Sequence, residues 1–376
     1  MRLGLLSVVM PAFNPGRFLL PAIESVLGQS WQDLELIVVN DGSTDGSTEI
    51  LSAVRDRRLR VINQENAGES AARNTGLQHC QGEYIMWNDA DDISLPHRAA
   101  TLVDALEGSA ASFAHSDMLL VDADGAPLGY WQAAPVPPAR MLQFLLRVGT
   151  PFNNASMLVR AEVFSGLSFN RSLLIGTDTD MVRQFAPEKP GVYVPEPLLL
   201  YRRWAGTATN GGSSAQETDQ VEVLLGAHSP EELVPEAKTG RDQECWRPVA
   251  LALVALALVR RGLVDSGARR LQAAASGCPE AARPLVAAVA ALCEGNLRSA
   301  ETCLSLCGDG DAIAVNLRGE IHAQRGEWTA ATAAFRDALA IDPSYYEPVL
   351  NLRGAGGARG MNLVDRTWAR FVPRAA

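Results

Sequence analysis

The chain has 376 residues, 47% of them hydrophobic, a length that suggests roughly two domains. Its 33 basic residues stand against 43 acidic ones, which gives a formal net charge of −10. This balance argues against a surface that neutralises phosphates, so we expect no nucleic-acid partner. The longest apolar run, 249–259, is shorter than the roughly 20 residues that a bilayer requires, so we expect no transmembrane segment.

The cysteines and the first residues both indicate a cytoplasmic chain. The six cysteines form no Cys-x-x-Cys pair and mostly lie in sequence rich in alanine and leucine, which favours buried thiols over disulfides or a metal site. The opening "MRLGLLSVVMPAF" lacks a small-residue cleavage site and is interpreted as a buried strand. Peripheral attachment to the inner face of the membrane through an arginine-rich tail is an open alternative.

Strand and helix patterns alternate through the first hundred residues. Apolar runs typical of buried strands occupy 5–13, 34–41, 59–64 and 83–89, and segments with helical spacing occupy 16–29, 47–56 and 68–80. This alternation predicts right-handed crossovers and a mostly parallel α/β sheet with helices on both faces. In such sheets, ligands bind outside the carboxyl ends of the strands.

The pattern is looser after residue 100. The sequence predicts a helix at 141–149, a strand at 155–160, a helix around 176–186 and an extended segment at 191–204. The first domain is therefore placed at 1–205. The polar stretch at 206–246 is interpreted as a linker or an extension of that domain.

From Pro248 onward the sequence is rich in alanine, leucine and arginine and begins to repeat. Three units share a glycine near their middle, at Gly262, Gly295 and Gly326, 33 and 31 residues apart, close to the period of helical-hairpin solenoids. The last unit resembles a tetratricopeptide repeat, and the residues that match are Gly319, Gly326, Ala331, Phe335, Ala338 and Pro343. We predict helical repeats at 247–350 and a Gly/Arg-rich tail at 351–376, with an ordinary alanine-rich helical domain as the alternative. A solenoid surface would bind a partner protein, a second copy or an acceptor.

The stretch "NDADD" places three carboxylates, Asp89, Asp91 and Asp92, directly after a predicted strand. Mutual repulsion between them costs stability, and a bound cation is the simplest remedy. Hard divalent cations prefer carboxylate oxygens and leave positions open for phosphates, so the stretch predicts a site for Mg²⁺ or Mn²⁺. Asp92 is expected either to cap the helix that begins near Pro96 or to orient its neighbours.

The stretches "SVVMPAFNPGRFLLPAIESVLGQSWQDLELIVVNDGSTDGS" and "NAGESAARNTGLQHCQGEYIMWNDADDISLPHR" resemble glycosyltransferase family 2. These enzymes are inverting nucleotide-sugar transferases with a GT-A fold, and the resemblance covers about residues 5 to 205. It implies a nucleotide-diphosphate sugar donor, a glycan or other hydroxyl acceptor, and a role in polysaccharide or glycoconjugate biosynthesis. It also implies that Asp91 is the direct metal ligand and that Asp89 lies near the ribose or a metal-bound water.

The resemblance assigns the donor site to strand ends of the first domain. It implies that Asp41 accepts a hydrogen bond from the nucleobase and that the backbone of Pro11, Ala12 and Asn14 lines the same pocket. An ionised carboxylate only accepts hydrogen bonds, which suits an imino N–H of a uracil-, thymine- or guanine-type base. Family members often carry a second acid before Asp41, where this chain has asparagine.

Arg73 matches the arginine of the family's Ala-Arg-Asn-x-Gly segment, which lies beside the donor. The family often has Tyr-Arg-x-His where this chain reads "YRRW", so Trp204 replaces a histidine near the metal or diphosphate. The metal site would then depend more on Asp91, phosphate oxygens and water. Arg202 or Arg203 would bind the diphosphate.

The catalytic base is expected at Asp178. Inverting transfer requires a carboxylate that takes the proton of the acceptor hydroxyl. The stretch "LLIGTDTDMVRQF" is similar to the family's Glu-Asp segment, but Thr177 stands where the family has glutamate. Asp180 is the competing base, and a helix N-cap is the structural alternative for Asp178.

Two other functions are compatible with the sequence. Thr177 and Trp204 leave room for a degenerate transferase domain that acts as a binding scaffold through the repeats, which would bind nucleotide without cleaving the donor. A nucleotidyltransferase on a similar sheet is less favoured, because no Gly-rich, lysine-containing triphosphate loop lies near the start.

Overall fold

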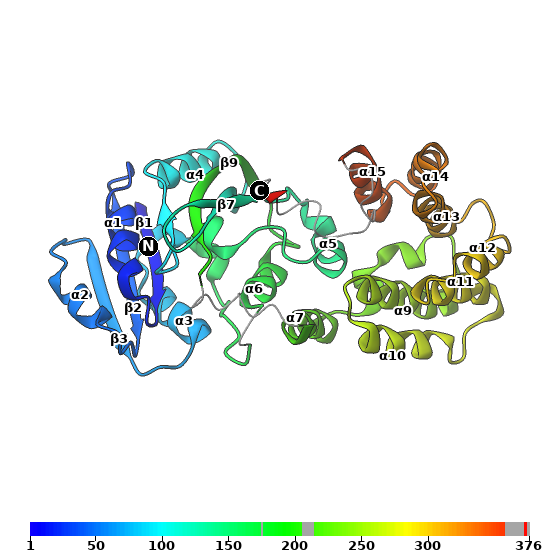
Figure 1. The fold of residues 1–376 in the computed structure, drawn as a ribbon, viewed down its shortest axis with the longest axis horizontal. Helices are drawn as coiled ribbons and strands as arrows, with labels where there is room; N and C mark the ends of the chain where they lie inside the picture. Colours follow the sequence, from blue (N-terminus) through cyan, green and yellow to red (C-terminus); the bar gives the residue numbers. More distant parts are fainter. Residues whose placement is uncertain (174–175, 205–213, 358–371, 374–376) are drawn as a thin grey trace. The chain divides into compact units, whose positions relative to one another are not determined.

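The computed structural model describes residues 1–173, 176–204, 214–357 and 372–373, which form two compact units (Figure 1). Within the described residues, the first unit consists of 1–141, 150–173, 176–204, 214–220 and 372–373, and the second consists of 142–149 and 221–357.

The first unit is built on one mixed sheet. Its strands are β1 (Arg2–Ala12), β2 (Leu34–Asp41), β3 (Leu59–Gln64), β4 (Gly82–Trp87), β5 (Ile93–Ser94), β6 (Phe113–Val121), β7 (Pro127–Trp131), β8 (Met157–Arg160), β9 (Gly191–Arg202) and β10 (Val372–Pro373). Its helices are α1 (Leu19–Leu27), α2 (Ser47–Ala53), α3 (Glu69–His79), α4 (Arg98–Glu107) and α6 (Thr177–Phe185), while α5 (Met141–Arg147) lies mostly in the second unit.

The strand order is β10-β7-β6-β8-β4-β1-β2-β3, and β9 pairs with both β5 and β6. Strands β4, β1, β2 and β3 are parallel neighbours, as the alternating pattern predicts. Beyond β4 the pairs with β8, β7 and β10 are antiparallel, and only β6 and β9 run parallel. The expected α/β class is confirmed, but the sheet is mixed where the sequence predicts a mostly parallel one, because the strands after β4 return mainly in antiparallel pairs.

Helices cover both faces of the parallel strands. On β2, Leu36 and Val38 belong to the core cluster that contains residues of α1 and α4, whereas Ile37 and Val39 pack with Ala72 of α3. Both faces of β2 are therefore buried, which explains why the strand reads as a continuous apolar run.

The second unit is helical. Its helices, after α7 (Ser214–Ala227), which crosses from the first unit, are α8 (Pro230–Leu233), α9 (Gln243–Arg260), α10 (Val264–Ala275), α11 (Arg283–Cys293), α12 (Leu297–Leu304), α13 (Ala312–Gln324), α14 (Trp328–Ile341) and α15 (Glu347–Gly357). Helices α9 and α10, α11 and α12, and α13 and α14 pack as successive pairs (Figure 1).

The three glycines that mark the sequence repeat lie between the helices of these pairs. Gly262, Gly295 and Gly326 have φ angles of +80°, +73° and +80°, in the left-handed region. Glycine is favoured there because it lacks a Cβ, and it commonly ends a helix in this way. The repeat therefore corresponds to three helical hairpins, and their assignment as tetratricopeptide repeats stays a prediction.

Replacing Gly319 by alanine is expected to destabilise the helical unit. An added Cβ would lie 2.7 Å from Cε1 of Phe335, whose side chain is fully buried. Overpacking lowers the free energy of unfolding by about 1–3 kcal/mol. The better helix propensity of alanine offsets at most about 1 kcal/mol of this. Urea unfolding of the full chain measures the change. Gly308→Ala is the control, since its Cβ would meet nothing within 4 Å, and equal stability of both variants would contradict the packing argument.

The structure divides the chain differently from the predicted domains in two places. The segment 142–149 joins the helical unit, and the unit boundary falls at 220/221, inside the predicted linker at 206–246. The predicted tail at 351–376 begins within α15, and its residues 358–371 and 374–376 lie outside the described part of the chain. Within the described ranges, no helix combines the length and apolar character needed to cross a membrane.

Candidate active site

The carboxyl ends of β4, β1 and β2 lie side by side and bring the predicted motifs together. The register pairs Ala12 at the end of β1 with Asn40 on β2. On the opposite edge of β1, Val9 pairs with Trp87 at the end of β4. The carbonyl of Val9 also accepts from the backbone N–H of Asn88 (3.1 Å). The segments after these three strands therefore share one edge of the sheet, where ligands of α/β folds bind.

Asp41 is buried and holds the loop that leads into α3. Its Oδ1 accepts from Nε2 of Gln64 (2.7 Å) and the backbone N–H of Ala67 (2.9 Å), and its Oδ2 accepts from the N–H of Gly68 (2.9 Å). Gln64 Oε1 in turn accepts from the hydroxyl of Thr75 (2.7 Å). Asp41 thus fixes the start of α3, and its predicted contact with a nucleobase stays a prediction.

The turn after β1 is tied to the turn after β2. Asn14 has a φ of +51°, which is uncommon for a residue other than glycine. Its Oδ1 accepts from the N–H of Thr44 (2.7 Å), and its own N–H donates to Oγ of Ser43 (3.0 Å). The backbone of Pro11, Ala12 and Asn14 therefore has a fixed shape beside Asp41.

Arg73 is the cation at the centre of this edge. Its side chain is 2% exposed, and its Nη2 donates to Glu69 (2.5 Å) and to Oδ1 of Asp89 (3.0 Å). The guanidinium lies over the rings of Trp87 (5.4 Å) and Phe169 (5.5 Å). Among the described residues its Nη1 has no hydrogen-bond partner, although it is buried. A buried donor without a partner is costly, which makes Arg73 a candidate for ligand contact.

Asp89 lies in an excess of negative charge. Burial raises its pKa to about 7, Arg73 opposes the shift, and the charges of Glu69, Asp91 and Asp178 add to it. Arg73 interacts with the charges of Glu69, Asp89 and Asp178. Because these carboxyl groups outnumber the guanidinium, a cation bound beside them would be stabilised.

Asp91 is held by the residue that replaces the expected histidine. Its Oδ2 accepts from Nε1 of Trp204 (2.8 Å), whose ring packs against Phe18 at 4.9 Å between centroids. Burial raises the pKa of Asp91, and the Trp204 hydrogen bond opposes this. A histidine could ligate a metal directly, but an indole only donates, so at this position Trp204 orients Asp91.

Asp92 and Arg202 connect the end of β4 to the end of β9. Oδ1 of the buried Asp92 accepts from the N–H of Arg202 (2.8 Å), so it orients neighbours. The capping alternative for Asp92 is wrong, because α4 begins after His97. The Arg202 side chain donates to carbonyls of Asp91 (2.8 Å) and Asp122 (2.9 Å). Its predicted contact with a diphosphate stays a prediction.

Asp178 lies in the first turn of α6, next to the charge cluster. The helix begins after Gly176, so the N-cap alternative for Asp178 is wrong. Its carboxylate accepts from Nδ2 (2.7 Å) and the backbone N–H (3.3 Å) of Asn154, and its charge raises the pKa of Asp89. Burial raises the pKa of Asp178 itself, against the opposing effect of Arg73.

Asp180 faces a different set of partners. Its Oδ1 pairs with Arg183 (2.7 Å), and its Oδ2 accepts from Gln184 (3.0 Å), both on its own helix. The two aspartates of α6 are thus distinguished by their surroundings, and only Asp178 lies with Arg73 and Asp89.

The described residues test whether a metal ion fits this edge. No group of three or more His, Cys, Asp or Glu side chains among them is arranged to hold a metal. Mg²⁺ needs no such cage, since it binds through one or two carboxylates with phosphates and water. Burial is the main cause of the raised pKa values of Asp89 and Asp91, and the charge of Glu69 adds to both shifts. The residues present therefore fit a cation that shares its coordination with a phosphate ligand.

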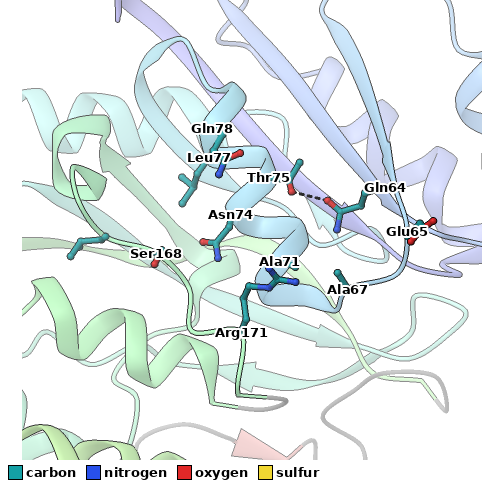
Figure 2. A pocket seen from close by; sticks show the side chains of 11 residues that line it. Gln64, Glu65, Ala67, Ala71, Asn74, Thr75, Leu77, Gln78, Ser168 and Arg171 are labelled. Carbon is teal, nitrogen blue, oxygen red and sulfur yellow. Dashed lines mark hydrogen bonds between the residues drawn. The ribbon is translucent and has the colours of Figure 1, made fainter.

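A pocket of about 470 Å³ opens beside α3 (Figure 2). It is lined by Gln64, Glu65, Ala67, Ala71, Asn74, Thr75, Leu77, Gln78, Leu167, Ser168 and Arg171. Figure 2 shows Gln64 bonded to Thr75 across its wall, and the same Gln64 contacts Asp41.

Sequence reasoning missed three residues of this edge. Glu69 stands four positions before Arg73, a spacing that marks a helical ion pair and could have identified it. Asn154, which contacts Asp178, and Asn74, which contacts Phe169, are joined to distant segments by tertiary structure, and no local pattern indicates those contacts.

Comparisons with known proteins agree on the first unit. Residues 7–164 match the model of "Glycosyl transferase family 2". GlyG of Streptococcus pneumoniae serotype 4, a glycosyltransferase, is 30% identical over 217 residues, which cover 54% of this chain and 72% of GlyG. An uncharacterized glycosyltransferase of Rickettsia felis is 29% identical over 206 residues, which cover 53% of this chain and 34% of that protein.

Among solved structures, S. aureus TarS 1–349 in complex with UDP-GlcNAc overlaps with 91% of this chain and 93% of that chain, with a TM-score of 0.47 and 15% identity. Membership rests on the sequence matches, because GlyG reaches 30% identity over more than two thirds of its own length. The chain belongs to glycosyltransferase family 2.

Proposed function

We propose that the chain transfers a glycosyl group, a hexosyl or related sugar, from a nucleotide-diphosphate sugar to a hydroxyl of a glycan or other acceptor, with inversion. One observation carries the proposal: Asp89 at the end of β4 pairs with the buried Arg73 (3.0 Å), and the charge of Asp178 at the start of α6 acts on both. This arrangement offers a cation-binding carboxylate edge and, beside it, a carboxylate able to accept a proton.

Asp178 is the base of the proposed reaction. The acceptor oxygen forms its bond to the anomeric carbon as the bond from that carbon to the diphosphate oxygen breaks. The acceptor proton passes to the Asp178 carboxylate, and the nucleoside diphosphate leaves. Burial raises the pKa of Asp178, which makes it a stronger base, and Asn154 fixes its orientation.

Asp91 and Asp89 would hold a Mg²⁺ or Mn²⁺ ion, which supplies positive charge that offsets the charge developing on the leaving diphosphate. Trp204 keeps the Asp91 carboxylate in place through its indole N–H. Arg73 contributes a positive charge of its own beside Asp89.

The nucleotide would lie over the ends of β1 and β2. Asp41 would accept from the base, beside the backbone of Pro11, Ala12 and Asn14, and Arg202 would lie toward the diphosphate. We further propose a role in cell-surface polysaccharide or glycoconjugate biosynthesis, on the cytoplasmic side or at the inner face of the membrane. The helical unit would then bind a partner protein, a second copy or the acceptor.

Replacing Asp91 by asparagine is expected to abolish metal-dependent donor binding. Asparagine keeps an oxygen that accepts from Trp204 but loses the negative charge that binds the cation. Calorimetric titration with UDP, GDP and dTDP, each with Mn²⁺ and with chelator, measures the loss. Asp104→Asn, on the exposed side of α4, is the control. An unchanged Mn²⁺-dependent affinity in the Asp91 variant would remove this residue as a ligand.

The second candidate function is a scaffold that binds nucleotide without cleaving the donor. Thr177 in place of the expected glutamate and Trp204 in place of the expected histidine favour it. Turnover separates the two functions, since a scaffold would release no nucleoside diphosphate from any sugar donor.

A further inference from the structure

Asn74 of α3 makes two hydrogen bonds to the backbone of Phe169, which is far away in the sequence. Its Nδ2 donates to the carbonyl of Phe169 (2.9 Å), and its Oδ1 accepts from the N–H of the same residue (2.8 Å). The amide therefore matches both polar groups of one backbone residue. Figure 2 shows Asn74 on the side of α3 that faces the segment carrying Ser168.

Phe169 forms part of the wall around Arg73. Its side chain is 2% exposed, and its ring meets Trp87 edge-on, with centroids 5.2 Å apart and planes at 88°. The guanidinium of Arg73 lies over both rings. Arg73 is thus bounded by the rings of Trp87 and Phe169 and is paired with Glu69 and Asp89 through its N–H groups.

Asn74 and Arg73 are neighbours on α3, and they hold Phe169 from two sides. Arg73 contacts its ring, and Asn74 contacts its backbone. If the amide is removed, the backbone of Phe169 loses both hydrogen bonds, and its ring is no longer fixed beside the guanidinium. The orientation of Arg73 toward Asp89 then depends on its ion pairs and on the ring of Trp87.

We infer that Asn74 is a positioning residue for the donor site: its two hydrogen bonds to Phe169 fix the aromatic wall that holds Arg73 beside Asp89. The inference rests on the proposed function, in which Arg73 lies against the donor. Asn74 itself does not touch the reacting groups. If the two Asn74–Phe169 hydrogen bonds were only structural, their loss would change the stability of the fold but not the affinity for nucleotide.

The test compares four variants of the full chain with the wild type: Asn74→Ala, Asn74→Asp, Arg73→Met and the double variant Asn74→Ala/Arg73→Met. Asn74→Asp keeps the acceptor for the N–H of Phe169 but loses the donor to its carbonyl. If Asn74→Ala does not fold, this variant still measures how loss of a hydrogen bond to Phe169 changes the affinity for nucleotide. Gln78→Ala is the matched control, because Gln78 lies one turn further along α3, is exposed and makes no side-chain hydrogen bond within the described part of the chain.

The readout is the Kd of the nucleoside diphosphate, from UDP, GDP and dTDP, that binds the wild type with Mn²⁺. Asn74→Ala is expected to raise that Kd about tenfold, and the double variant is expected to bind no more weakly than Arg73→Met alone, since residues that act through one another are not additive. Gln78→Ala is expected to bind as the wild type does. Unfolding midpoints are recorded for every variant, so a loss of fold is separated from a loss of affinity.

Three results would overturn the inference. If Asn74→Ala and Asn74→Asp bind the diphosphate as tightly as the wild type, the two Asn74–Phe169 hydrogen bonds are structural only. If the losses of the two single variants add in the double variant, Asn74 does not act through Arg73. If the wild type binds none of the diphosphates, the proposed donor site fails and this inference fails with it, an outcome that the wild-type titration alone identifies.

Discussion

Replacing Asp178 by asparagine is expected to lower glycosyl transfer by on the order of 10² or more, because the acceptor hydroxyl loses its general base. Donor binding is expected to be unchanged, since Asp178 lies at the acceptor side of the proposed reaction. The amide is nearly the same size and can still accept one hydrogen bond from Asn154, so the start of α6 is expected to keep its shape. Initial rates of nucleoside diphosphate release, with the Kd for the diphosphate measured in parallel, separate the two effects.

Asp180→Asn is the comparison for that result. Asp180 pairs with Arg183 and Gln184, so its replacement is expected to affect the stability of α6 more than the transfer rate. If Asp178→Asn transfers at a near-normal rate and Asp180→Asn loses most of its transfer rate, the general base is Asp180 and not Asp178.

A buried ionic network holds the segment 142–149 within the helical unit. Arg147 pairs with Glu236 and with Glu347 (3.3 Å), and these three side chains are 4% exposed or less. Arg260 pairs with the same Glu347 (2.7 Å) and with Glu320. Although burial opposes it, the two arginines hold the pKa of Glu347 below its ordinary value.

Arg147→Met is expected to destabilise the helical unit by about 3–5 kcal/mol, because it leaves Glu236 and Glu347 buried without that partner. Burial already raises the pKa of Glu236, and loss of Arg147 removes the main opposing effect. A carboxyl whose pKa is raised by folding destabilises the fold more as pH rises through that pKa, so the loss is expected to be larger at pH 8 than at pH 5.

Denaturant unfolding of the full chain at both pH values measures this change. Arg325→Met is the control, because its pair with Glu301 (2.8 Å) is exposed and should contribute little. If both variants unfold at the same denaturant concentration, the network does not stabilise the helical unit.

The parts of the fold that follow from local pattern were predictable. Apolar runs between helical segments predict β1 to β4 and their parallel direction, since strands alternating with helices form right-handed crossovers. The glycines Gly262, Gly295 and Gly326 predict where helices end, because each adopts a left-handed φ. Asp41 after β2 and the Asp89–Asp91 stretch after β4 are expected at one edge, because the carboxyl ends of parallel strands lie there. The role of Asp178 follows only from the family resemblance.

The features that sequence reasoning missed depend on partners far apart in the chain. The sequence predicts a helix at 141–149, but its place in the helical unit is set by Glu236 and Arg261, about a hundred residues further on. Trp204 was recognised as a departure, but its hydrogen bond to Asp91 arises because β9 ends beside β4. Such contacts are selected by tertiary packing, which no local periodicity records.

The central claim, that the chain is a metal-dependent glycosyltransferase and not a scaffold, is tested most directly by nucleoside diphosphate release from a panel of UDP-, GDP- and dTDP-sugars. The account predicts release from at least one donor with Mn²⁺, loss of release with chelator, and a rate reduced by on the order of 10² in Asp178→Asn. Binding of a diphosphate without cleavage of any of these donors would contradict the claim and favour the scaffold.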